Sequence, residues 1–166
     1  KGGMAALSLF DQIFAGADVA EAFSDRAHVQ GLLDFESALA RAEAGAGVIP
    51  LKAARAIARQ CDASFYDLDS LGAAAREAGN TLIPLQAALT ARVAAKDKTA
   101  AGFVHWGATS QDALDTGLVL QMRTALGLLD ADLRKCESAL AALARKHRAT
   151  PMVGRTWMQQ ALPITF

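Results

Sequence analysis

The chain has 166 residues, which is long enough for a domain with a buried core. It is 52% hydrophobic and only 6% aromatic, a composition that favours close-packed helices over a sheet. Seventeen basic residues balance seventeen acidic ones, so charge does not indicate nucleic acid or an anionic membrane as a partner. No apolar run approaches the roughly 18 residues that span a bilayer, and no secretory signal is evident. We therefore expect a soluble protein of the cytoplasm.

The first hundred residues predict a series of short helices separated by turns. Residues 7–14 are expected to form one or two helical turns. Ser24 is a favourable N-cap for a helix that ends at the glycines of 45–47. Three further helices are expected: one opened by Pro50 that stops near 61–62, one over 68–78 capped by Asp67, and one with Pro84 in its first turn. Residues 96–98 are expected to form a solvated loop.

A single long helix is predicted from Ser110 to about Arg148. No proline interrupts this stretch, and apolar residues recur in it at steps of three and four. A helix of about 38 residues would be roughly 57 Å long at 1.5 Å per residue. That length exceeds ordinary globular helices and implies a long bundle or a helix shared between subunits.

The remaining residues are expected to continue the helical pattern. Pro151 should end the long helix, residues 154–156 should form a turn, and another helix should begin near Ala161. No strand is predicted, so the expected fold class is all-α. We expect an N-terminal helical domain over 1–109 and the start of a long-helix bundle domain over 110–166.

A polar cluster precedes the long helix and is the first candidate site. Thr109 and Ser110 fall at the predicted N-cap, and acidic residues follow in the first turns. The first N–H groups of a helix lack internal partners, so hydroxyls beside them form a seat for a carboxylate or phosphate. Simple helix capping explains the same residues. His105 and Gln111 flank the hydroxyls, and no metal-ligand spacing, phosphate loop or nucleophile elbow is present. No metal or cofactor is expected.

Several segments follow one another along nearly the whole chain in a recognisable order. They are HWGATSQDALDT at 105–116, GRTWMQQALP at 154–163, the stretches 9–11, 23–26 and 33–43, AGN at 78–80 and IPL at 83–85. Together these segments resemble the fumarase/aspartase superfamily, and the likeness is greatest to its lactonizing branch, the 3-carboxy-cis,cis-muconate cycloisomerase family. This resemblance implies a homotetramer with a central helical bundle, a small-molecule dicarboxylate or tricarboxylate substrate, and a place in protocatechuate degradation.

The resemblance implies three groups of substrate-binding residues. The first is His105, Thr109 and Ser110 with Gln111, which in relatives lies in a segment that contacts a substrate carboxylate. The second is Arg155, Thr156, Trp157 and Gln159, and the third is Asn80. Bland alternatives stay open, because Arg155 can stabilise a turn, Trp157 can be a core aromatic and Asn80 can simply end a helix.

Trp157 favours the lactonizing branch over the lyases that release fumarate. The position of Trp157 resembles the site at which those lyases have a histidine that transfers a proton. An indole N–H is only a donor and cannot do this work at neutral pH. A lactonizing enzyme needs no such base, because the substrate's own carboxylate adds across a neighbouring double bond. The indole ring can instead hold the diene in a reactive fold.

The resemblance places the catalytic acid downstream of Phe166, so its identity is unknown. We therefore expect this chain to be an incomplete N-terminal part that binds substrate poorly and is inactive alone. Two alternatives remain: a fumarate-releasing lyase, such as one acting on adenylosuccinate, or a non-enzymatic helical scaffold. The scaffold accounts for the composition, but not for polar clusters at both ends of the long helix.

Overall fold

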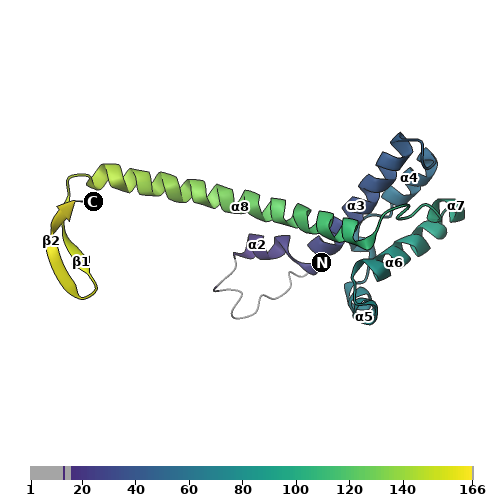
Figure 1. The fold of residues 1–166 in the computed structure, drawn as a ribbon, viewed down its shortest axis with the longest axis horizontal. Coiled ribbons are helices and arrows are strands. Elements are labelled where there is room, and N and C mark those ends of the chain that lie inside the picture. The colour runs from purple at the N-terminus through teal and green to yellow at the C-terminus, as the bar shows by residue number, and fades with distance from the viewer. Residues whose placement is uncertain (1–12, 14–15, 166) are drawn as a thin grey trace. The chain divides into compact units, whose positions relative to one another are not determined.

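The computed structural model describes residues 13 and 16–165, which fall into two compact units divided between Ala125 and Leu126. Helices dominate the described residues, as Figure 1 shows, and the predicted all-α class is confirmed apart from one hairpin near the C-terminus. The predicted helix at 7–14 lies almost entirely outside the described residues. Among the residues that are described, no helix is long and apolar enough to cross a membrane.

The first unit consists of short helices and the beginning of one long helix. The four helices predicted between residues 24 and 95 are confirmed as α3, α4, α5 and α6, whereas α2 and α7 were not predicted. One turn or two of helix is too short to show a clear periodicity. The elements are α2 (Ala17–Ala22), α3 (Asp25–Gly45), α4 (Leu51–Ala58), the 3-10 turn η1 (Ala63–Phe65), α5 (Leu68–Ala78), α6 (Leu82–Ala94), α7 (Lys98–Ala101) and α8 (Ser110–His147).

Local signals explain where these helices begin. Ser24 caps α3, because its Oγ accepts a hydrogen bond of 3.2 Å from the Ala27 N–H. Asp97 does the same for α7, where its Oδ1 accepts from the N–H groups of Thr99 and Ala100 at 3.1 and 3.0 Å. Residues 96–98 are therefore not a simple loop. Asp97 turns their end into a capped helix.

The core of the first unit is formed by the inner faces of α3, α4 and α6 together with the start of α8. Leu32, Leu33 and Leu89 are fully buried, and Ala113 on α8 is buried with them. At about 25 cal/mol per Å², burial of each of these leucine side chains contributes roughly 1.5–3 kcal/mol. This apolar contact fixes the first turns of α8 against α3.

Helices α3 and α8 approach closely at a pair of glycines. A Cβ built on Gly31 would lie 3.1 Å from the Cα and O of Gly117, and one on Gly117 would lie 3.3 Å from the Gly31 carbonyl carbon. The absence of side chains at both positions permits backbone contact. The crossing places the N-terminus of α8 beside the middle of α3.

The second unit ends in a two-stranded antiparallel hairpin, β1 (Pro151–Thr156) and β2 (Gln159–Thr165). The predicted turn at 154–156 and the helix near Ala161 are therefore wrong. Pro163 explains part of this error, because a residue that precedes proline disfavours the α region. The turn instead falls at Trp157, whose φ of 51° is the left-handed value required in tight hairpins.

Replacing Gly154 by alanine is expected to disrupt the hairpin. A Cβ at this position would lie 2.9 Å from the Leu162 carbonyl oxygen of the opposite strand, where the pairing is already irregular. Amide hydrogen exchange across residues 151–165 should accelerate at least tenfold. Gly102→Ala is the matched control, since its nearest contact would be an ordinary 3.5 Å. Unchanged protection in the Gly154 variant would contradict this packing.

Candidate functional site

His105, the first residue of the polar motif, contacts a glutamate that sequence reasoning did not select. Its Nδ1 lies 2.6 Å from Oε1 of Glu36, which is on α3 and 69 positions away in the chain. Glu36 is 1% exposed, and its Oε2 is sealed from solvent without a hydrogen-bond partner. Burial raises the pKa of the Glu36 carboxyl, and the charge of His105 opposes that rise. The sequence feature that could have identified Glu36 is its position on the apolar face of a predicted helix, beside Leu32 and Leu33.

The backbone around His105 is strained. His105 has a φ of 56°, and Gly107 follows with a φ of 70°. For a residue with a side chain, a left-handed conformation costs roughly 1–3 kcal/mol and persists only where the surroundings hold it. The Glu36 contact and the Phe35 ring, 6.4 Å from the imidazole, hold His105 in this turn.

The start of α8 leaves two hydroxyl groups available. The Thr109 N–H donates to Asp112 Oδ2 at 2.9 Å, which is half of a capping box. Neither the Thr109 nor the Ser110 hydroxyl bonds to any residue that the structure describes. Gln111 differs, because its Nε2 donates to Asp115 Oδ1 at 2.6 Å. Thr109 and Ser110 are therefore freer than Gln111 to meet a ligand.

A cavity of about 710 Å³ adjoins the polar motif. It contains three carboxyl side chains, and burial raises the pKa of one of them, Glu43. This acidic lining does not favour an anionic substrate, and neither Thr109 nor Ser110 lines it. Its lining residues are Phe35, Leu39, Glu43, Val48, Trp106, Gly107, Ala108, Asp112, Asp115 and Thr116.

The second predicted group lies on the hairpin of the second unit and forms a cluster of its own. Thr156 pairs with Gln159 at the end of the strands, and Arg155 pairs with Gln160. Trp157 occupies the turn and is 97% exposed, so within this chain it is not a core aromatic.

Asn80 has a local structural role. Its Oδ1 accepts a hydrogen bond of 2.8 Å from the Leu82 N–H at the start of α6, directly after Gly79, whose φ is 63°. The turn between α5 and α6 therefore accounts for Asn80 without a ligand.

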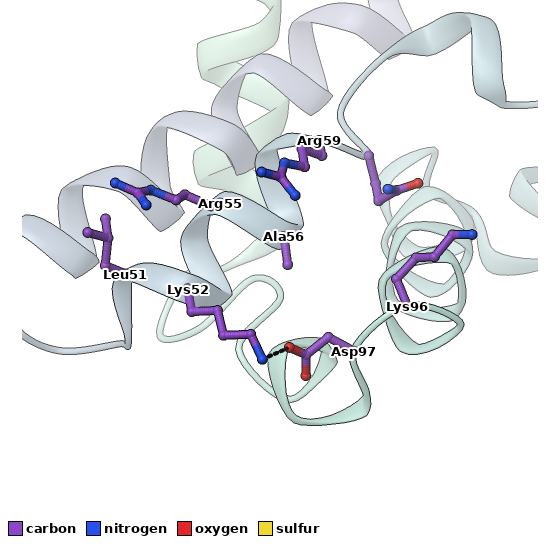
Figure 2. Close-up of a pocket in the computed structure, with 8 residues that line it drawn as sticks. Leu51, Lys52, Arg55, Ala56, Arg59, Lys96 and Asp97 are labelled. Carbon is purple, nitrogen blue, oxygen red and sulfur yellow. Dashed lines mark ion pairs between the residues drawn. The ribbon is translucent and has the colours of Figure 1, made fainter.

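A second cavity, of about 620 Å³, lies between α4 and the start of α7. It is rich in cations, but Figure 2 shows that they do not converge. Lys52 is paired with Asp97 at 3.1 Å, and Arg55 and Arg59 extend along a different side of α4. The arrangement forms a solvated basic surface rather than a defined anion seat. Within the described part of the chain, no group of three His, Cys, Asp or Glu residues is arranged to hold a metal ion.

Comparisons with known proteins agree with the motifs. A protein family described as Lyase matches residues 15–166. The 3-carboxy-cis,cis-muconate cycloisomerase of Pseudomonas putida is 54% identical over 157 residues, covering 95% of this chain and 37% of that protein. The nitrosuccinate lyase of Streptomyces davaonensis is 46% identical over 158 residues, covering 95% of this chain and 33% of that protein.

A solved structure gives the same result. The crystal structure of 3-carboxy-cis,cis-muconate lactonizing enzyme from Pseudomonas putida superposes with a TM-score of 0.91 at 53% identity, covering 95% of this chain and 36% of that one. This chain thus spans about a third of the length of the relatives it matches. Because the family match covers nearly every residue, the chain belongs to the lyase family of the fumarase/aspartase superfamily.

Proposed function

We propose that this chain is the N-terminal part of an enzyme that converts 3-carboxy-cis,cis-muconate to carboxymuconolactone. The observation that supports this most directly is the 54% identity to the Pseudomonas putida cycloisomerase across 95% of the chain. Trp157 cannot act as a base, and lactonization needs no base at this position, so the residue agrees with a cycloisomerase. The enzyme would act in protocatechuate degradation in the cytoplasm, as a homotetramer.

The proposed reaction forms one C–O bond and one C–H bond. A carboxylate oxygen of the substrate adds to a carbon of the neighbouring double bond, and the adjacent carbon then receives a proton. Negative charge develops on the carboxyl group beside that second carbon, giving an enolate-like intermediate. Hydrogen-bond donors aimed at its oxygens stabilise the transition state more than the substrate.

Residues of this chain would supply part of that donor set. His105, Thr109 and Ser110 would hold a substrate carboxylate with the first N–H groups of α8. Thr156, Gln159 and Arg155 would contribute from the hairpin, and the Trp157 ring would confine the diene. Gln111 and Asn80 remain weaker candidates, since each has a local partner. The acid that delivers the proton would lie beyond Phe166.

The domain boundary at residue 109 also stays a proposal. The N-terminal helical domain, 1–109, would position the polar motif, and the segment 110–166 would enter the central bundle. Exposed leucines along α8, such as Leu133 and Leu140, are consistent with burial in such a bundle. The oligomeric mass of the full-length protein in solution tests this part directly.

The activity is tested with protein made from the uninterrupted reading frame, by ultraviolet absorbance on 3-carboxy-cis,cis-muconate. We expect rapid loss of the diene absorbance with lactone as the product. If the diene absorbance does not change while nitrosuccinate or adenylosuccinate is cleaved, the cycloisomerase proposal is replaced by a fumarate-releasing lyase. Nitrosuccinate is included because of the 46% identity to nitrosuccinate lyase. No reaction with any of these would favour the scaffold. Residues 1–166 alone are expected to be inactive.

A further inference from the structure

Glu36 is the one fully buried carboxyl group in the part of the chain that the structure describes. A buried carboxylate is costly unless it is paired and hydrogen-bonded. Its Oε1 meets His105 Nδ1 at 2.6 Å, while Oε2 has no partner. Among the described residues, the compensation that Glu36 receives comes from His105, through its ring and its backbone N–H. An arrangement this unfavourable for stability calls for a role beyond packing.

The protons of the Glu36–His105 pair can be counted. If the pair carries no net charge, it is either carboxylate with imidazolium or carboxylic acid with neutral imidazole. In both forms one hydrogen lies between Oε1 and Nδ1, and a second hydrogen is on Nε2. If the pair carries one negative charge, Nδ1 keeps its hydrogen and Nε2 is bare. The state of Nε2 therefore depends on the net charge that the site tolerates.

The surroundings favour the pair without net charge. Desolvation disfavours a buried negative charge, and the carboxyl group of Glu43, on the same helix, adds repulsion toward Glu36. From the segment after α4, the thiol of Cys61 also faces Glu36 and brings no positive charge. Burial and Glu43 both disfavour a net negative charge on the pair. The form without net charge, in which Nε2 carries a hydrogen, is therefore the favoured one.

Nε2 is the atom of the pair that has no partner among the described residues and is not sealed from solvent as Glu36 Oε2 is. The His105 side chain as a whole is 8% exposed. Four and five residues further along the chain, Thr109 and Ser110 present hydroxyls without partners in the described structure. One buried acid thus supports a donor at the edge of the polar motif.

We propose that Glu36 is a positioning residue, which fixes the ring of His105 and keeps a hydrogen on its Nε2 for donation to a substrate carboxylate. The ligand in this statement rests on the proposed function. The proton arrangement rests on the buried pair alone, so the two can fail separately.

The first test reads the proton directly and needs no substrate. Solid-state ¹⁵N NMR of histidine-labelled full-length protein near pH 7, with the spectrum of His105→Asn subtracted, isolates the two ring nitrogens. We expect Nε2 to carry a hydrogen. A bare Nε2 with hydrogen only on Nδ1 would overturn the proposal, whether or not any variant at position 36 folds.

The second test uses Glu36→Gln. Glutamine keeps the shape of the glutamate side chain, but its neutral amide cannot share a proton with His105 as a carboxyl group does. We expect KM for 3-carboxy-cis,cis-muconate to rise about tenfold to a hundredfold with a smaller change in kcat, because a charge-assisted hydrogen bond is weakened. The pH dependence of kcat/KM should also change. Ser37→Ala, at a buried neighbour whose hydroxyl accepts only from Arg41 at 3.1 Å, should leave both unchanged.

These outcomes separate the possible failures. Wild-type kinetics and an unaltered pH profile in Glu36→Gln would overturn the positioning role even with hydrogen on Nε2. Equal losses in Glu36→Gln and Ser37→Ala would also overturn it, since they indicate a packing effect. If the wild-type protein ignores the muconate, the proposed function fails, and the NMR result still decides the state of the pair.

Discussion

Replacing Gly31 or Gly117 by alanine is expected to destabilise the first unit by about 1–3 kcal/mol, the usual cost of overpacking. At Gly31 the new methyl group would lie 3.1 Å from backbone atoms of Gly117, and backbone cannot rotate away as a flexible side chain can. One helix must therefore move. The intrinsic gain of up to about 1 kcal/mol from glycine to alanine in a helix is too small to offset this.

Two other helical glycines provide matched controls for this experiment. Gly72 on α5 and Gly127 on α8 have no atoms within 4 Å of a built Cβ. Gly72→Ala and Gly127→Ala should therefore be neutral or stabilising by up to about 1 kcal/mol. Thermal denaturation of the full-length protein measures the contrast, at roughly 2–4 °C per kcal/mol for a chain of this size or above. Equal behaviour of all four variants would contradict the close helix crossing.

The glycine crossing also connects stability to the candidate site. It sets the distance between Glu36 on α3 and the turn that leads into α8. A shift of α8 would move Thr109 and Ser110 relative to His105. Misplacement of about 1 Å can cost a hundredfold in rate. Activity should therefore fall in Gly31→Ala even under conditions where the variant remains folded.

The helices could be predicted from the sequence because their signals are local. Ser24 provides a cap at one end of α3, and α8 ends one residue before the predicted Arg148. The hairpin could not be read this way. Ala161 and Leu162 are good helix formers, and only Pro163 and pairing with the strand from Pro151 oppose a helix there.

The candidate site was predictable only in part, for the same reason. The hydroxyls of Thr109 and Ser110 follow from the motif and the helix start. The Glu36–His105 contact joins residues 69 positions apart and depends on how α3 packs, so no local pattern contains it. The signal was indirect: Glu36 shares a helical face with the fully buried Leu32 and Leu33.

Replacing Ser110 by alanine in the full-length protein is expected to lower kcat by about a hundredfold to a thousandfold, the usual effect of removing one donor to a developing oxyanion. Stability should change little, because the Ser110 hydroxyl makes no hydrogen bond to the described residues, whereas a true cap would lose about 1 kcal/mol. Thr124→Ala is the matched control on α8, since its hydroxyl bonds only to Leu120 O at 3.2 Å.

The ratio of the two effects decides the role of Ser110. Loss of a donor that acts on charge formed during ring closure lowers kcat more than it raises KM. Loss of a cap lowers the melting temperature and leaves kcat intact below it. If Ser110→Ala matches Thr124→Ala in both rate and melting temperature, then Ser110 belongs to neither the donor set nor the cap. The carboxylate seat would then rest on His105, Thr109 and the N–H groups of α8.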